Sequence, residues 1–224
     1  MLQFLQAGGP FMILLVLTSI VSVAFIVERG LALRRNKVAP DVVEDALDRC
    51  QGRDDLASLQ VICQQQPTPL SRLVLVAIEH LPNPKTDNAD SVQTRARHEV
   101  VQLERGLVVL EIITGIAPLL GLVGTLHGMI TLFGDIGAKG LGDNSVFARG
   151  ISITLNTTLM GLLIAIPSLI AWSYFSKKIE SMAVEMETLL DEFLRKIYRT
   201  PVSVGRKAKR AAAGAHATEA AAAD

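Results

Sequence analysis

Aromatic residues and cysteines are scarce in this chain of 224 residues, and its net charge is zero. Phe, Tyr and Trp together make up 4% of the sequence, and the only two cysteines are Cys50 and Cys63. Two isolated cysteines support neither a disulfide framework nor a zinc knuckle, so we expect both to be buried as small apolar side chains. The 22 basic and 22 acidic residues balance, which argues against an overall attraction to nucleic acid.

The motifs of enzyme chemistry are also missing. No phosphate-binding loop or nucleophile motif occurs, and the histidines do not have the spacing of metal ligands. These histidines are His80, His98, His127 and His216. We therefore predict that the chain is not an enzyme, has no catalytic residues and binds no metal or cofactor.

What the chain has instead is three long hydrophobic runs without Asp, Glu, Lys or Arg. They cover residues 11–27, 112–133 and 151–175. The first would rise about 25 Å as a helix, near the lower limit for crossing a bilayer. A signal peptide is the alternative for this run, but no cationic segment precedes it and no A-x-A site follows it. The three runs predict three transmembrane helices.

Basic residues flank these runs mainly on one side of the membrane. That side carries Arg29, Arg34, Arg35, Lys37, Arg95, Arg97, Arg105, Lys177 and Lys178, and the other side has Lys139 and Arg149. Basic flanks mark the cytoplasmic side. We therefore expect residues 1–10 and the loop 134–150 outside, and the segments 28–111 and 176–199 in the cytoplasm.

The segments outside the membrane have the pattern of helices. Proline and glycine positions delimit helices at 41–50, 54–65 and 70–81, and a further helix should run from Asp90 unbroken into the second span. The third span should continue to Tyr198, with an apolar stripe of Ile179, Met182, Met186, Leu189, Leu190, Phe193 and Ile197. The predicted fold is an all-α membrane protein with a helical cytoplasmic domain.

The tail 200–224 is alanine-rich and of low complexity, which predicts disorder. Its basic cluster 206–210 could contact nucleic acid, but a cytoplasmic position beside anionic lipid is the simpler explanation.

Small and polar residues are concentrated in the second and third spans. Gly121, Gly124 and Gly128 form a stripe that allows close helix packing, and Thr125 borders it. Pro118 should kink the second span or open its hydrogen-bond ladder.

In the third span, Thr154, Thr158, Gly161 and Ala165 share one helix face. This face is suited equally to lining a pore and to packing against another helix. Asn156 points away from Thr158, and we expect it to bond to a neighbouring helix.

His127 is a titratable residue inside a predicted span and so a candidate for an ion pathway, although its shallow depth favours a solvated position at the interface. No carboxylate lies within the three runs, and Glu111 stands only at the cytoplasmic mouth of the second. If protons cross here, a second protein must supply the membrane acid.

Two motifs resemble those of the MotA/TolQ/ExbB proton-channel family, and specifically its ExbB/TolQ branch. The second-span motif is matched by Pro118, Gly121, Leu122, Gly124, Thr125, Gly128 and Met129. The third-span motif is matched by Thr158, Gly161, Leu162, Ala165, Ile166 and Pro167. The segments PTPLSRLVLVAIEHL and ERGLALRR are also similar to family segments, so the resemblance covers about residues 5–200.

The resemblance implies a pentamer in the bacterial inner membrane whose second and third spans line a central pore. The pore would hold the single transmembrane helices of an ExbD/TolR-like partner, each with one aspartate. Proton passage would drive motion that a TonB- or TolA-like transducer delivers to the outer membrane. Thr125 and Thr158 match the pore threonines of the family, and Pro118 and Pro167 belong to its span motifs.

The sequence departs from the family pattern at two positions. Ile153 replaces a glutamate of the third span, and His127 stands where many members have tryptophan. The first departure leaves the route of proton release and the coupling ion open. A flagellar stator subunit is an alternative, but such subunits have four spans. A membrane scaffold without ion flux would show the same spans and packing motifs.

Overall fold

The computed structural model describes residues 9–139 and 144–199, and these ranges contain helices and no β-strand. The elements are α2 (Gly9–Ala32), α3 (Arg35–Val38), α4 (Asp41–Arg49), the short 3-10 helix η1 (Arg53–Asp55), α5 (Leu56–Gln65), α6 (Pro69–Glu79), α7 (Lys85–Glu104), α8 (Leu107–Lys139) and α9 (Asn144–Arg199). The predicted tail 200–224 lies outside the described residues. So do residues 1–8 of the predicted outer N-terminus and residues 140–143 of the predicted loop.

Three of these helices are long and apolar enough to cross a membrane. The segments are Pro10–Ala32, Leu107–Gly137 and Gly150–Arg199. Each predicted hydrophobic run lies inside one of them, which confirms the all-α membrane fold with three spans. The third helix runs without interruption from its span to Arg199, as the apolar stripe predicted.

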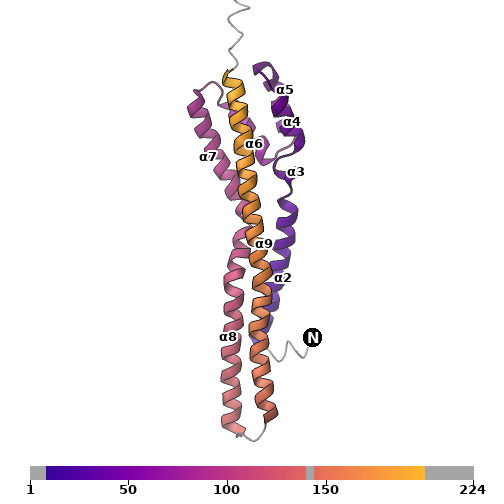
Figure 1. Ribbon diagram of the computed structural model, residues 1–224, viewed down its shortest axis with the longest axis vertical. Helices are drawn as coiled ribbons and strands as arrows, with labels where there is room; N and C mark the ends of the chain where they lie inside the picture. Colours follow the sequence, from indigo (N-terminus) through magenta and orange to yellow (C-terminus); the bar gives the residue numbers. More distant parts are fainter. Residues whose placement is uncertain (1–8, 140–143, 200–224) are drawn as a thin grey trace, which may run out of the picture. The chain divides into compact units, whose positions relative to one another are not determined.

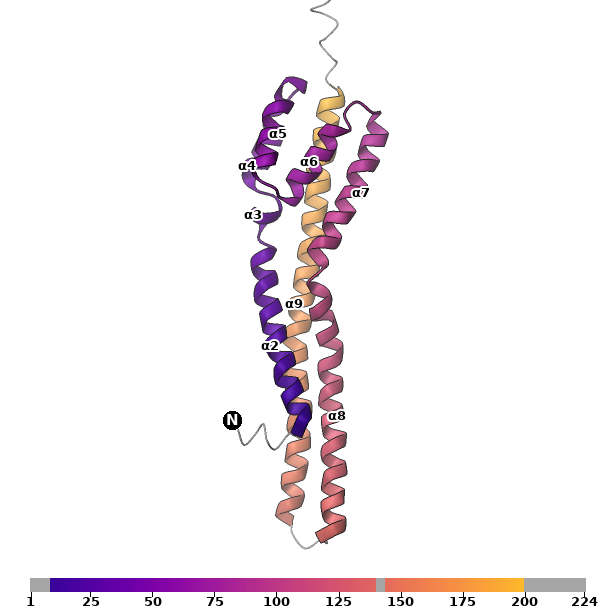
Figure 2. The same ribbon diagram turned by 180° about the vertical axis from the view of Figure 1, so that it is seen from behind.

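The chain forms two compact units. The first contains residues 9–37 and 98–183, and the second contains residues 38–97 and 184–199. In the first unit, α8 runs beside the first part of α9, with α2 packed next to them (Figures 1 and 2). One of its cores consists of buried Leu33, Leu107, Leu110, Phe175 and Ile179.

The predicted unbroken helix from Asp90 into the second span is wrong. The structure begins this helix earlier, at Lys85, and interrupts it with a turn at Arg105 and Gly106. A nitrogen of Arg29, Nη1, donates a hydrogen bond of 3.2 Å to the carbonyl oxygen of Leu103. In a continuous α-helix that oxygen would accept from residue 107. The Arg29 guanidinium therefore takes the place of the backbone donor that a continuous helix through α7 and α8 would provide.

In the second unit, the short helices pack against the last turns of α9. Thr68 caps α6 by accepting a hydrogen bond from the Ser71 nitrogen, and Pro69 occupies the first helical position. The apolar stripe of α9 is buried here through Met186, Leu190, Phe193 and Ile197. At its end, the Tyr198 hydroxyl donates a hydrogen bond of 2.8 Å to the carbonyl oxygen of Asn83.

Candidate functional site

The helices α8 and α9 approach each other closely through small residues. A Cβ atom added to Gly161 would lie 2.6 Å from the carbonyl oxygen of Ala117 and 3.2 Å from the Cα atom of Gly121. A Cβ atom at Gly121 would in turn lie 3.1 Å from the Cα atom of Thr158. A side chain at Gly161 does not fit at 2.6 Å, and one at Gly121 would be in unusually tight contact. The glycines therefore allow the two backbones to come this close.

The next two glycines of the stripe receive threonine side chains. A Cβ atom at Gly124 would lie 3.1 Å from Cβ of Thr157, and one at Gly128 would lie 2.5 Å from Cγ2 of Thr154. The stripe Gly121, Gly124 and Gly128 therefore lies along the contact with α9. The fit also shows which side of α8 faces α9.

The predicted face of α9 divides into two groups. Thr154 and Ala165 are only 4% and 6% exposed, and Gly161 is buried, because all three lie in the contact with α8. Thr158 is half-buried at the edge of this contact. Its hydroxyl donates a long hydrogen bond of 3.5 Å to the carbonyl oxygen of Gly121.

Thr157 was not singled out by the sequence analysis, yet it is the most buried threonine of this contact. It is 1% exposed, and its hydroxyl donates a hydrogen bond of 2.7 Å to the carbonyl oxygen of Thr154. Its spacing was the available signal, since Thr157 stands three residues after Thr154 and four before Gly161, on the same side of the helix. A threonine whose hydroxyl bonds to its own helix backbone can fill the space beside a glycine of the neighbouring helix. No polar group is then left without a hydrogen bond.

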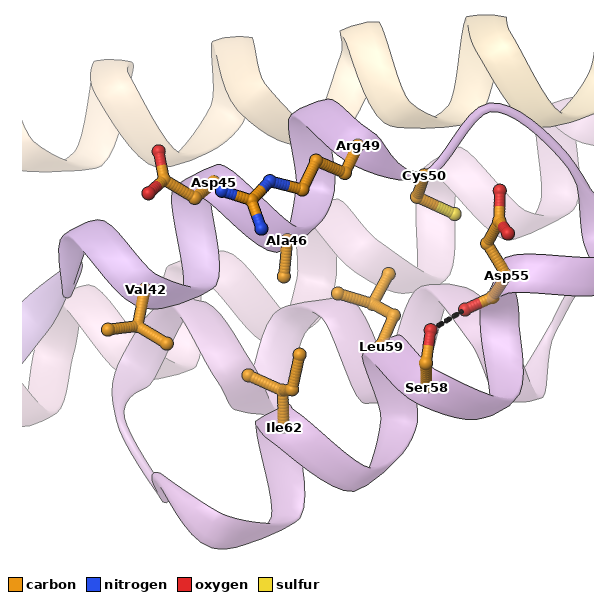
Figure 3. A pocket seen from close by; sticks show the side chains of 9 residues that line it. All are labelled: Val42, Asp45, Ala46, Arg49, Cys50, Asp55, Ser58, Leu59 and Ile62. Atoms are coloured by element: carbon orange, nitrogen blue, oxygen red, sulfur yellow. Dashed lines mark hydrogen bonds between the residues drawn. The ribbon is translucent and has the colours of Figure 1, made fainter.

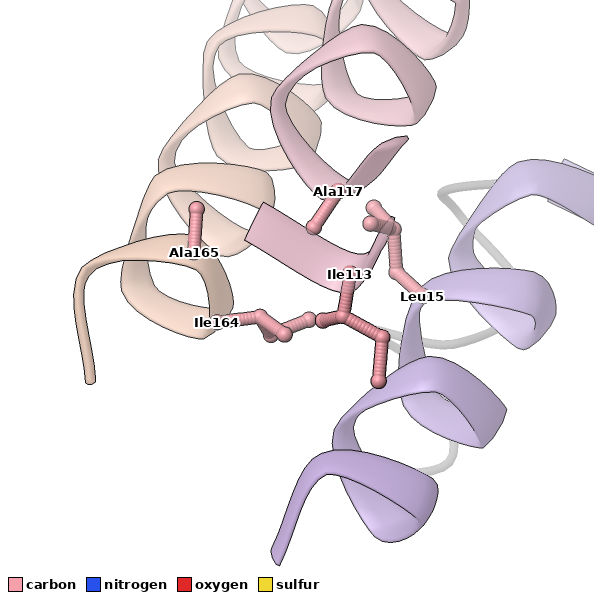
Figure 4. Close-up of a cluster of buried hydrophobic side chains, with 5 residues drawn as sticks. All are labelled: Leu15, Ile113, Ala117, Ile164 and Ala165. Atoms are coloured by element: carbon pink, nitrogen blue, oxygen red, sulfur yellow. The ribbon is translucent and has the colours of Figure 1, made fainter. Parts of the chain in front are cut away.

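The first span packs on one side of this helix pair. Leu15 of α2 forms a buried cluster with Ile113 and Ala117 of α8 and with Ile164 and Ala165 of α9 (Figure 4). The hydroxyl of Ser168 donates to the carbonyl oxygen of Ile164 at 2.7 Å.

A polar contact also joins α2 to α9. The oxygens of Ser22 and Ser168 lie 2.6 Å apart, and both residues are buried. Because the Ser168 proton is used toward Ile164, Ser22 must be the donor between the two hydroxyls. This hydrogen bond fixes the register of α2 along α9.

His127 lies on the side of α8 that faces α2. Its ring centroid is 5.5 Å from that of Phe11, at an interplanar angle of 58°. Successive helix residues are about 100° apart, so Thr125 lies about 160° around α8 from His127.

On α9, Thr158 lies about 120° from Ile164, which packs with α2. Thr125 is also half-buried, and its hydroxyl donates to the carbonyl oxygen of Leu122 at 2.6 Å. Thr125 and Thr158 thus lie on the flank of the helix pair that is turned away from α2. We call this surface the threonine flank.

The remaining predicted packing residues occupy different surroundings. Pro118 and Pro167 lie inside helices that continue through them. Asn156 is half-buried, and within the described part of the chain its side chain makes no hydrogen bond. Its predicted bond to a neighbouring helix is therefore not found among the described residues of one chain.

The second unit contains a shallow groove between α4 and α5 (Figure 3). Its apolar lining includes Val42, Leu59 and Ile62. Its charged residues are Asp45, Arg49 and Asp55. Cys50 also lines the groove, and burial raises the pKa of its thiol.

Among the residues that the structure describes, no cluster of His, Cys, Asp or Glu could hold a metal ion.

The chain is similar to known membrane proteins over most of its length. A model of the MotA/TolQ/ExbB proton channel family matches residues 65–188, which is more than half of the chain. The biopolymer transport protein ExbB-like 1 of Synechocystis sp. is 30% identical over 203 residues, covering 88% of this chain and 78% of that protein.

Two further relatives carry names from both halves of one branch. The Tol-Pal system protein TolQ of Pseudomonas aeruginosa is 28% identical over 202 residues, covering 84% of this chain and 86% of TolQ. The biopolymer transport protein ExbB of Aquifex aeolicus is 27% identical over 117 residues, covering 52% of this chain and 78% of ExbB. The matched region contains the α8 glycine stripe, the threonine flank and the α9 span, so the chain belongs to the MotA/TolQ/ExbB proton channel family, in its ExbB/TolQ branch.

Proposed function

We propose that this protein is the channel-forming subunit of a proton-driven motor in the bacterial inner membrane. Five copies would surround the single-span helices of an ExbD/TolR-like partner, each with a membrane aspartate. The complex would energise outer-membrane processes through a TonB- or TolA-like transducer. The observation that carries this proposal is the position of Thr125 and Thr158 on one flank of the α8–α9 pair, away from α2.

The threonine flank has the properties of a pore wall. A ring of subunits must place one surface of each toward the axis, and α2 covers the opposite side of α8. These two hydroxyls lie within the uncharged runs 112–133 and 151–175, where they can hydrogen-bond to water or to a polar side chain of a partner inside the bilayer. Thr125 and Thr158 are therefore the residues that we assign to the pore.

Three other residues of the predicted pore face lie behind this wall, in the contact between α8 and α9. Thr154, Gly161 and Ala165 are buried between α8 and α9, where they set the distance between the two helices. In the proposed ring they lie directly behind the pore surface. Their substitution should change the shape of the pore rather than its polarity.

The requirement for a partner follows from the charges. The runs 112–133 and 151–175 contain no Asp or Glu. Proton passage through a membrane protein ordinarily uses a buried acid, so a single-span helix with an aspartate would complete the pathway. The relatives are named for biopolymer transport (ExbB) and for the Tol-Pal system (TolQ), and both names are consistent with a subunit of such a complex.

The basic flanks of the spans support one orientation. With the N-terminus and the 134–150 loop in the periplasm, the segment 28–111 and the end of α9 lie in the cytoplasm. The partner and the transducer would then reach the periplasm from the pore axis.

The first experiment measures the native mass of the complex in detergent, with the chain alone and co-expressed with a single-span partner. We expect five copies of the chain, which retain the partner when its membrane aspartate is present. A monomer or dimer that retains no such partner would contradict the proposal and favour a membrane scaffold. A stable pentamer without a partner-dependent proton flux would also favour the scaffold.

A further inference from the structure

A third polar side chain lies on the threonine flank, near the N-terminal end of α8. Glu111, Pro118 and Thr125 follow one another at intervals of seven residues. Seven residues are almost two full turns, so each step rotates the side chain by only about 20° around the helix. The three residues therefore form one stripe, and Glu111 is its carboxylate.

Glu111 is open to its surroundings. Its residue is exposed, as is Gly115 one turn further along α8, where an added Cβ atom would meet no atom within 4 Å. Nothing within the described part of the chain covers the stripe at this point. A ring of subunits would therefore leave the Glu111 carboxylate accessible from the pore.

Pro118 adds a polar group between the two ends of the stripe. Proline has no N–H, so the carbonyl oxygen of Thr114 lacks the helix donor that residue 118 would provide. Thr114 also turns its hydroxyl to the Glu111 carbonyl oxygen at 2.6 Å. The Thr114 carbonyl oxygen, which Pro118 leaves without its usual helix donor, lies one turn from Glu111 and can accept a hydrogen bond from water.

We propose that Glu111 is the proton acceptor at the cytoplasmic mouth of the pathway. This inference rests on the proposed function. A carboxylate oxygen of Glu111 binds a proton that has passed the threonine flank and the partner aspartate, and then loses it to cytoplasmic water. The group returns to its starting state, and nothing is oxidised or reduced.

The surroundings of Glu111 leave it as the principal ionisable group at this depth. The spans packed against α8 contain no Asp, Glu, Lys or Arg, in residues 11–27 of α2 and 150–176 of α9. The next charged side chains along these helices are Glu28, Arg29, Lys177 and Lys178. On α8 itself, the other ionisable residues are His127, on the side that faces α2, and Asp135 and Lys139 near the opposite end of the helix.

The test measures proton flux in liposomes that contain the complete complex with its partner, at several pH values on the cytoplasmic side. We expect Glu111→Gln to slow the flux at least about tenfold and to flatten its dependence on cytoplasmic pH. Glu111→Asp should restore most of both. Glu187→Gln is the matched control, since Glu187 is an exposed acid of α9 beyond its hydrophobic run 151–175, and it should behave like the wild type.

Each outcome separates this inference from the proposed function. A conducting wild-type complex with an unchanged rate and pH profile in Glu111→Gln would overturn the role of Glu111 and leave the channel intact. Loss of assembly in Glu111→Gln, seen as a changed native mass, would assign a structural role and overturn the inference as well. A wild-type complex without flux would contradict the proposed function itself.

Discussion

Gly161 of α9 faces the backbone of Ala117 on α8 so closely that a Cβ atom at position 161 would lie 2.6 Å from the Ala117 carbonyl oxygen. The contact is between two main chains, and neither can move aside as a flexible side chain can. The two helices of the proposed pore wall can therefore come this close only because position 161 carries a hydrogen atom and not a methyl group.

Gly161→Ala should destabilise the protein, because the added methyl group must push α8 and α9 apart. Overpacking of this kind costs about 1–3 kcal/mol. Thermal unfolding in detergent should show a lower midpoint than the wild type. Gly115→Ala is the control, since its methyl group enters open space, and it should be neutral or slightly stabilising. Equal midpoints for Gly161→Ala and Gly115→Ala would show that the contact does not exist.

The turn between α7 and α8 depends on Arg29, and a double-mutant cycle should show it. The side chain of Arg29 fills the space that a Cβ atom at Gly106 would need. The backbone at Gly106 does not require glycine, because it is not in the left-handed region. Gly106→Ala should therefore destabilise the wild type but be tolerated once Arg29 is alanine.

The coupling between these two substitutions should be at least about 0.5 kcal/mol in unfolding experiments. Arg29→Ala alone should also lower stability, because the Leu103 carbonyl oxygen loses its donor. The pair Arg29→Ala and Gly115→Ala serves as the control and should be additive. Additive effects of Arg29→Ala and Gly106→Ala would contradict the assigned contact.

Tyr198→Phe should loosen the end of α9 in the second unit. The substitution removes the donor to the Asn83 carbonyl oxygen and the acceptor of the Asn88 amide, which lies 3.2 Å from the hydroxyl. We expect a loss of about 1 kcal/mol and faster amide exchange in residues 80–85. Tyr174→Phe is the control, because Tyr174 is 61% exposed. Unchanged exchange in Tyr198→Phe would contradict this anchoring role.

Cys63 should be an unreactive thiol in the folded protein. Burial raises its pKa from 9.0 to about 11. At pH 8 the thiolate population, and with it the rate of reaction with a disulfide reagent, should be about a hundredfold lower than for a free thiol. The Cys50→Ser variant isolates the signal of Cys63. Reaction at the rate of a free thiol would show that Cys63 is not buried.

The same pKa shift predicts how stability depends on pH. Between pH 9 and pH 11 the unfolded chain releases the Cys63 proton while the folded protein still holds it. Stability should therefore fall as the pH rises through this window. Cys63→Ala should reduce the fall, and an identical pH profile in that variant would exclude Cys63 as its source.

The sequence predicted the spans and the apolar stripe of α9 because both depend on local patterns. Runs without charge and residues at helical spacing are visible without any knowledge of contacts. The turn at Gly106 was missed for the opposite reason, since it is made by Arg29, which lies far away in the sequence. The residues around Gly106 do not reveal whether the helix continues through this glycine or is interrupted there by the distant Arg29 side chain.

The roles within the third span were only partly predictable. The face of Thr154, Thr158, Gly161 and Ala165 was equally suited to a pore and to packing. The contact with α8 places three of the four between the helices and leaves Thr158 at the edge. The positions of these residues around α9 could not predict this division, because it depends on which side of α9 packs against α8. The pore assignment of Thr125 and Thr158 stays a prediction.

The most direct test is proton flux through liposomes containing the chain and its partner, compared between the wild type and the Thr125→Val, Thr158→Val double variant. Thr131→Val is the control, because its hydroxyl also bonds to its own helix, at 2.9 Å from the His127 carbonyl oxygen, but lies about 120° around α8 from Thr125. We predict flux only with the partner, loss of flux in the double variant at unchanged native mass, and normal flux in the control. Undiminished flux in the double variant would contradict the assignment of the threonine flank to the pore.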